Sequence, residues 1–395
     1  MLKKAVQKVN KNRNIIGLMG SHLMRNILYM FLNTFMVAYF ITLTNYDYSK
    51  ISVYYILSYL FLSLTFFALG RIIKNINQIL VFRMGMILNS IYVILIAILK
   101  ESIINYYVIL GIFYGIVQGF FWISLHSLIN EYVGKKTNKF VSIKSIFDNI
   151  LKILVPIVLG VSIEYTSFTY VANIVIFISV IQILFSLMIK DESAVSEKKY
   201  DIKGFWLKYK NNELLKKCYK INSYGGIVNH LLDTIITIII VMTFKTTISL
   251  GVLTTLFSIC SIISVFIYQN KIKNKKNFLS VATVSLVFSI LLLIIKMNKI
   301  TIIIYNLCSG IFLVILKNIA EAKRYTVTEK IKEIEKDFLV EYHVISECHI
   351  NIARIIGYGI LFVASLFNNL IVFNLLLIVI MIIIYKYYEL IVSVE

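Results

Sequence analysis

Long apolar stretches recur along the whole chain, and they restrict its fold more than any other feature of the sequence. An α-helix needs roughly 20 apolar residues to cross the hydrocarbon core of a bilayer, whereas a transmembrane β-strand is about half as long and alternates in polarity. Segments of helical length lie near 15–43, 51–70, 79–98, 106–128, 141–162, 169–189, 221–244, 248–268, 277–295, 300–319, 338–366 and 370–388. The sequence therefore predicts an all-α polytopic membrane protein, embedded in a lipid bilayer, with twelve transmembrane helices.

The chain also carries a formal net charge of +20, which raises the question of nucleic-acid binding. If the N-terminus is cytoplasmic, nearly all basic residues lie at the N-terminus or in every second loop, including 271–276 and 323–336. The exceptions outside are Lys50, Lys100, Lys245, Lys296 and Lys299. This is the positive-inside pattern of membrane proteins. We therefore expect a multi-pass protein of the plasma membrane, with both termini in the cytoplasm and no nucleic-acid partner.

The longest polar interval, about 190–220, separates six predicted spans from six others. We interpret it as a cytoplasmic central loop between an N-terminal six-helix half (1–189) and a C-terminal six-helix half (221–395). Weak internal repeats favour halves related by pseudo-two-fold symmetry. In spans one and seven, polar residues share the helical offsets 0, 3, 4 and 7: His22, Arg25, Asn26 and Tyr29 match His230, Asp233, Thr234 and Thr237. In spans five and eleven, Asp148, Lys152 and Gly160 match Glu347, Asn351 and Gly359 at a constant shift.

Three short motifs lie between spans two and five. Gly70 begins the loop segment "GRIIKNINQ", Gln118-Gly119 lies in span four, and Pro156 and Gly160 enclose "PIVLG" in span five. Through these residues the chain resembles the major facilitator superfamily over essentially its full length. The corresponding family signatures are Gly-x-x-x-Asp-(Arg)-x-Gly-(Arg), Arg-x-x-Gln-Gly in drug antiporters, and Gly-Pro-x-x-Gly-Gly in the antiporter branch. The resemblance implies alternating access, with gating or bending roles for Gly70, Pro156 and Gly160.

The chain also departs from these signatures. Lys74 stands where the family has the Asp, Asn77 where it has the second Gly, and Gly115 where it has the Arg. The gating charge and the proton-coupling route of the family are therefore not carried over. Pro156 is the only proline, and a proline in a membrane helix frees a carbonyl that neighbouring helices can bind. Its bend either packs span five against a neighbour on the extracellular side, as the resemblance implies, or is incidental.

Span eleven contains a polar stripe. His343, Glu347, Asn351, Arg354 and Tyr358 lie within about 80° of one another around an ideal helix and cannot face lipid. A charge inside the membrane is costly and is a functional hypothesis by default. We predict that Glu347 is the main proton-coupling residue; the alternative is a static network that stabilises helix packing.

Charges in other spans extend this network. Asp148 and Lys152 have the i, i+4 spacing of an ion pair, and the predicted charge network comprises Asp148, Asp233, Glu347, Arg25, Lys152, Arg354, His343 and Asn351, with Asp233 as the reserve proton site. Equal numbers of acids and bases favour charges that exchange partners between conformations, or an amphipathic substrate. The side chains expected at a central substrate cavity are His22, Asn26, Tyr29, His230, Thr237, Gln118, Trp122 and Tyr358. No His or Cys spacing indicates a metal site, and we expect no cofactor.

These features favour a secondary active transporter, not an enzyme: a monomeric, proton-coupled exporter of a small amphipathic or lipophilic compound. The direction rests on Pro156 and Gly160 alone. A polytopic acyl or glycosyl transferase is one alternative, although the short outside loops lack catalytic His or Asp motifs. A non-transporting membrane receptor or scaffold is the other alternative.

Overall fold

The computed structural model of the chain describes residues 2–74, 77–132, 137–190, 199–270, 275–334, 338–367 and 370–393. The side chains of the predicted basic loops 271–276 and 323–336 lie outside this described part. Within it, every regular element is helical. The helices of the first part of the chain are α1 (Leu2–Met30), α2 (Met36–Leu43), α3 (Ser49–Ile73), α4 (Gln78–Leu99), α5 (Tyr107–Tyr132), α6 (Thr137–Tyr165) and α7 (Phe168–Leu187). The later helices are α8 (Ile202–Tyr209), α9 (Glu213–Gly226), α10 (Leu232–Phe244), α11 (Thr247–Asn270), α12 (Lys275–Ile295), α13 (Lys299–Ile334), α14 (Leu339–Phe367) and α15 (Leu370–Val392).

Three shorter helical segments join or extend these helices. A π-helical turn, Phe31–Phe35, joins α1 to α2, and a second, Ile227–Leu231, joins α9 to α10. A 3₁₀ turn, Lys100–Ile104, follows α4. Because each π-helical turn continues its neighbours without a break, α1 and α2 together form one span and α9 and α10 form another.

In the described residues, twelve helical stretches are long and apolar enough to cross a membrane, which confirms the predicted number. The seventh stretch begins at Glu213, earlier than the expected 221, and α8 also lies in the interval expected to be a loop. Many spans are rich in β-branched residues, such as the segment "TIITIIIV" in α10. They are nevertheless helical because a helix satisfies all of its backbone polar groups internally, which hydrocarbon requires.

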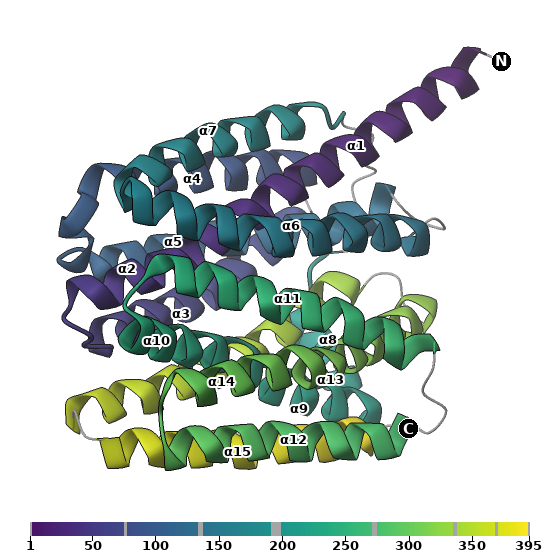
Figure 1. Cartoon of the computed structure of the whole chain (residues 1–395). Coiled ribbons are helices and arrows are strands. Elements are labelled where there is room, and N and C mark those ends of the chain that lie inside the picture. The colour runs from purple at the N-terminus through teal and green to yellow at the C-terminus, as the bar shows by residue number, and fades with distance from the viewer. Residues whose placement is uncertain are drawn as a thin grey trace.

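The helices form two groups. Figure 1 shows those of the first half of the chain, in purple to blue, mainly in the upper part of the view and those of the second half, in green to yellow, mainly in the lower part. The groups meet where α6 packs against α11 and where α3 packs against α14. A pseudo-two-fold relation between the groups stays a prediction.

The contact between α6 and α11 depends on glycine and on the proline. A Cβ on Gly160 or Gly251 would lie 2.6 or 2.5 Å from a backbone oxygen of the opposite helix, and at Gly251 that oxygen belongs to Pro156. Thr255 Oγ1 of α11 donates a hydrogen bond of 2.9 Å to the carbonyl of Ile153. Pro156 of span five therefore lies at the contact with span eight, where Thr255 binds the carbonyl of Ile153, three residues before the proline.

The contact between α3 and α14 contains a buried ion pair. Lys74 Nζ lies 2.6 Å from Glu341 Oε1, and both side chains are almost fully buried. The same carboxylate oxygen accepts a hydrogen bond of 2.9 Å from the backbone N–H of Asp201. Nearby, a Cβ on Gly70 would lie 2.9 Å from the side chain of Val344. The lysine that replaces the family's aspartate thus pairs with an acid of span eleven, so the pair joins the two groups.

Candidate functional site

A polar cavity lies between the two groups of helices. It encloses about 380 Å³, including the part that is open to solvent. Hydroxyl, amide and ionisable side chains line it: Tyr29, Asn33, Thr34, Tyr55, Tyr59, His230, Asp233, Thr234, Thr237 and Tyr358. Since spans one, two, seven and eleven all contribute, the cavity has the position and the chemistry of a substrate site.

Both π-helical turns lie at this cavity. Asn33 and Thr34 belong to the turn Phe31–Phe35, and His230 belongs to the turn Ile227–Leu231. A π-helical turn disturbs the regular backbone hydrogen bonding of an α-helix and is found frequently at functional sites. Asn33 Nδ2 donates a hydrogen bond of 2.7 Å to the hydroxyl of Tyr114, which holds its amide in place. The irregular segments of spans one and seven are therefore used to form the lining.

Three tyrosine rings form an aromatic surface on one side of the cavity. The centroids of Tyr55 and Tyr358 are 4.7 Å apart at an interplanar angle of 27°, and those of Tyr55 and Tyr59 are 5.9 Å apart at 16°. The hydroxyl groups of Tyr358 and Thr234 lie 2.6 Å apart, and Tyr358 also donates to the carbonyl of His230 at 3.2 Å. The rings are thus held by contacts between spans two, seven and eleven.

Arg354 lies directly behind this lining. Its Nη2 lies 2.6 Å from Nε2 of His230, and its Nη1 donates a hydrogen bond of 2.9 Å to Oδ1 of Asn351. Its Cζ lies 4.8 Å from the ring centroid of Tyr59. Because a guanidinium group only donates, His230 accepts at Nε2, and the imidazole is neutral in this arrangement. Spans seven and eleven therefore meet at this contact.

Asp233 is the acid of the cavity. Its side chain is 59% exposed, and its Oδ2 lies 3.7 Å from Nζ of Lys317 in α13. Lys152 of span five is close enough to interact with it electrostatically. The pair with Lys317 is long for an ion pair, so Asp233 keeps access to the solvent of the cavity.

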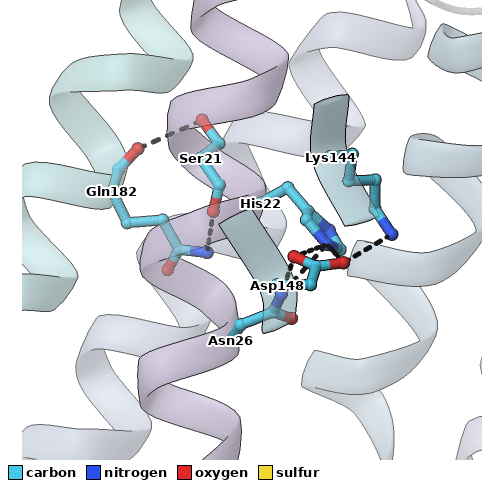
Figure 2. A network of polar contacts seen from close by, with 6 residues as sticks. All are labelled: Ser21, His22, Asn26, Lys144, Asp148 and Gln182. Carbon is cyan, nitrogen blue, oxygen red and sulfur yellow. Dashed lines mark hydrogen bonds and ion pairs between the residues drawn. The ribbon is translucent and has the colours of Figure 1, made fainter. Parts of the chain in front are cut away.

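A second polar cluster connects spans one and five away from the cavity lining (Figure 2). Asp148 accepts a hydrogen bond of 2.6 Å from Asn26 and lies 3.3 Å from Nε2 of His22. Its other oxygen lies 3.1 Å from Nζ of Lys144. The structure pairs Asp148 with Lys144, one turn earlier on the same helix. Helix spacing allows either lysine as a partner, and the predicted pair with Lys152 stays a prediction.

Arg25 lies in a third environment, inside the first group of helices. It is 1% exposed, donates to Asn89 of α4, and has its Cζ 4.9 Å from the ring centroid of Phe121. Asn89 in turn donates a hydrogen bond of 3.2 Å to Gln182 of α7, and Figure 2 shows Gln182 bonded to the backbone of Ser21. This network joins α1, α4, α5 and α7, and Arg25 is not itself part of the cavity lining.

The remaining predicted site residues are distributed as follows. Tyr29 and Thr237 line the cavity, whereas Glu347 and His343 belong to the part of α14 nearer its start and are not in the lining. Trp122 donates a hydrogen bond of 3.1 Å to Gln118, one turn earlier in α5. Helix α5 packs closely on α3 at its glycines, where a Cβ on Gly111 would lie 2.6 Å from the carbonyl oxygen of Tyr54.

Sequence reasoning missed six contributors to the site: Asn33, Thr34, Tyr55, Tyr59, Thr234 and Lys317. The sequence nevertheless carries signals for most of them. Tyr55 and Tyr59 have i, i+4 spacing in an otherwise apolar span, which places both rings on one helix face. Asn33-Thr34 and Lys317-Asn318 are short polar pairs within apolar spans, and the cost of burying such groups marks them as candidates.

The chain is similar to a known protein family and to two known sequences. Residues 15–321 match the model of the Major Facilitator Superfamily. The chain is 20% identical over 370 residues to the uncharacterized protein YqgE of Bacillus subtilis (strain 168), covering 90% of this chain and 84% of that protein. It is also 28% identical over 108 residues to an uncharacterized protein in the sodM 3' region of Geobacillus stearothermophilus, covering 27% of this chain and half of that protein.

Two solved structures share the fold. A crystal structure of the nucleoside transporter NupG has a TM-score of 0.69 at 11% identity, covering 96% of this chain and 99% of that chain. A bacterial homologue of the iron transporter ferroportin, in an inward-facing state, has a TM-score of 0.69 at 13% identity and covers 98% of both chains. The twelve-span helical fold, the motif positions and the match over most of its length show that this chain belongs to the major facilitator superfamily.

Proposed function

We propose that this protein is a proton-coupled secondary transporter that moves a small amphipathic molecule through the central cavity by alternating access. The observation that carries the proposal is Asp233, an acid that is exposed to a polar cavity within the span region and loosely paired with Lys317. The family and its transporter neighbours favour a transporter over the polytopic enzyme and over the receptor or scaffold. The polar lining favours an amphipathic substrate over a purely lipophilic one.

Asp233 fits the requirement for coupling protonation to conformation. A ligand, including a proton, shifts a conformational equilibrium only if its affinity differs between the states. The proton affinity of an acid depends on its distance to nearby cations. A movement of α13 relative to α10 would change the distance from Asp233 to Lys317 and so the affinity for the proton. Glu347, the main candidate from sequence, does not line the cavity, and we therefore place Asp233 first and Glu347 second.

The two contacts between the helix groups support the proposed alternating movement. The ion pair of Lys74 and Glu341 lies at one end of α3 and α14, and the glycine contact of α6 with α11 lies near Gly160. Opening of the cavity to one side or the other would separate one contact and keep the other. We propose export as the direction of transport, on the resemblance of Pro156 and Gly160 to the antiporter motif.

The test compares Asp233→Asn with Glu347→Gln in proteoliposomes, using a compound found by thermal-shift screening of the purified protein. We expect Asp233→Asn to abolish accumulation driven by a pH gradient while exchange of substrate across the membrane continues. Glu347→Gln should retain gradient-driven accumulation. If Asp233→Asn accumulates the compound as well as the parent protein does, Asp233 is not the coupling site. If only Glu347→Gln loses accumulation, Glu347 is the proton-coupling site.

A further inference from the structure

The charge of Arg354 is not balanced by a carboxylate among the residues that the structure describes. Its recorded polar partners are the amide oxygen of Asn351 and the ring nitrogen of His230, both neutral. Its Nε is buried and has no hydrogen-bond partner in this arrangement. A charge within the membrane region is costly and is normally paired. Arg354 can therefore donate a further hydrogen bond to an anion.

A comparison with Arg25 shows why Arg354 in particular can bind a ligand. Arg25 also has neutral recorded partners, but it is 1% exposed and enclosed by α1, α4 and α5. Arg354 is only half-buried, and two of the groups in contact with it, His230 and Tyr59, line the cavity. A solute in the cavity would meet Arg354 by displacing the His230 contact.

The charged side chains around the cavity also favour an anionic ligand. Among the described side chains around the cavity, Asp233 is the acid, and it already has Lys317 at 3.7 Å and Lys152 as an electrostatic neighbour. Arg354 adds a further positive charge near the same space. Basic groups therefore outnumber acidic ones there, in contrast to the equal numbers expected from sequence. A cavity with an excess of one charge raises the local concentration of the opposite ion.

The aromatic side chains of the lining also favour a particular ligand shape. The rings of Tyr55, Tyr59 and Tyr358 form an aromatic cluster in the cavity lining, in which Tyr55 stacks on both of the others. Offset stacking on such rings favours a planar aromatic group.

We propose that the transported compound is a small aromatic carboxylate. Its carboxylate binds the guanidinium group of Arg354, and its ring packs against the aromatic cluster of Tyr55, Tyr59 and Tyr358. An arginine fork matches the two oxygens of a carboxylate, which gives both strength and orientation. This inference rests on the proposed transport function, because it names the substrate class of the same cavity.

The experiment measures binding of three compounds with the same ring system and different charges. 2-Naphthoate is an anion, 2-naphthamide is neutral, and 2-naphthylmethylamine is a cation at neutral pH. Each is titrated by calorimetry into the full-length protein in lipid nanodiscs, with empty nanodiscs as the blank. We expect the parent protein to bind 2-naphthoate at least about tenfold more tightly than the amide, since a charge-assisted pair is lost in the amide.

The variants are Arg354→Gln, which removes the charge, and Arg354→Lys, which keeps it without the fork. We expect Arg354→Gln to bind the acid and the amide equally, with its affinity for the amide unchanged, and Arg354→Lys to keep part of the preference. Lys386→Gln, which removes one positive charge from the exposed surface of α15, is the matched control and should bind like the parent.

The parent protein's ranking of the three compounds is a test that does not depend on whether any variant folds. Stronger binding of the amide or the amine, or no binding of any of the three up to their solubility limits, would overturn the proposal. So would an anion preference that survives in Arg354→Gln. If a neutral or cationic compound is accumulated by a pH gradient, the transport function stands and this inference fails. If 2-naphthoate binds through Arg354 but Asp233→Asn still accumulates it, only the proposed coupling site fails.

Discussion

Single residues of the same type have different environments in this protein, and their roles are expected to differ accordingly. Asp148 is enclosed by His22, Asn26 and Lys144, whereas Asp233 opens to the cavity with one loose partner. An acid with several close partners stabilises the helices that it joins, and its removal leaves buried groups unpaired. An acid with solvent access can exchange a proton during a transport cycle.

We therefore expect Asp148→Asn to reduce stability without abolishing coupling. Loss of the charge weakens contacts with His22 and Lys144, at a cost of about 1–3 kcal/mol in the free energy of unfolding. The melting temperature of the purified protein should fall, and pH-driven accumulation in proteoliposomes should persist in the fraction that stays folded. Loss of coupling at unchanged stability would give Asp148 the role that we assign to Asp233.

A second prediction at this scale concerns the hydroxyl of Tyr358. Tyr358→Phe keeps the ring that stacks on Tyr55 and removes the hydrogen bonds to Thr234 and the carbonyl of His230. The expected loss is about 1 kcal/mol in stability per net hydrogen bond, with binding of aromatic probes changed little. Tyr358→Leu should weaken probe binding, because the planar surface is lost. If Tyr358→Leu binds the aromatic probes as tightly as the parent protein does, the ring of Tyr358 is not part of the binding site.

At the scale of elements, the two inter-group contacts are built in different ways. The contact of α3 with α14 contains a buried ion pair, and the contact of α6 with α11 depends on backbones that approach closely at glycine. An ion pair can separate and form again between conformations, whereas a glycine contact can act as a pivot because no side chain intervenes. Pro156 lies at the second contact.

We expect the pair of Lys74 and Glu341 to stabilise the conformation seen here. Removing one partner of a buried pair costs about 3–5 kcal/mol because the other charge is left alone. Lys74→Ala and Glu341→Ala should each lower the melting temperature, and the double variant should be less destabilised than the sum of the two. Additive effects in this double-mutant cycle would show that the two side chains do not interact.

Glycine at position 160 is expected to be required, and position 359 offers a matched control. A Cβ on Gly160 meets the backbone of α11, whereas a Cβ on Gly359 meets nothing within 4 Å. Gly160→Val should therefore separate α6 from α11 and cost about 1–3 kcal/mol, as overpacking does. Gly359→Val should be tolerated. The readouts are melting temperature and transport rate, and equal behaviour of the two variants would contradict the close contact.

Pro156→Ala tests the role of the proline itself. Alanine restores the backbone donor that proline lacks, so α6 can form its regular i→i−4 hydrogen bond at this position. We expect normal insertion into the membrane and slower or uncoupled transport, measured in proteoliposomes with the same compound as for Asp233→Asn. Transport at the parent rate would identify the proline as an incidental kink.

At the scale of the whole molecule, the distribution of basic residues predicts the orientation in the membrane. The prediction of cytoplasmic termini follows from the positive-inside rule. A reporter active only in the cytoplasm, fused after residue 395, should be active, and the same reporter inserted in the short loop at Lys245 should be inactive. The opposite result at both positions would invert the topology and with it the proposed direction of transport.

The number of spans and the polar stripe of span eleven were determined by the sequence itself, because hydropathy and helical periodicity are local properties. The motif positions by themselves also indicated the family. The start of the seventh span was placed too late because "ELLKKCYKINSY" in α9 is polar on one face, and its other face is buried by α14 and other helices.

The tertiary structure alone decided which interior charges meet. Arg25 and Asp148 occur in the same kind of sequence pattern as Asp233 and Arg354, yet the first two are enclosed by neighbouring helices and the last two lie at the cavity. The difference depends on the rotation of each helix about its axis and on its depth in the bundle. Packing between helices far apart in sequence sets both quantities, so the partners of a charged side chain depend on residues that its own segment does not contain.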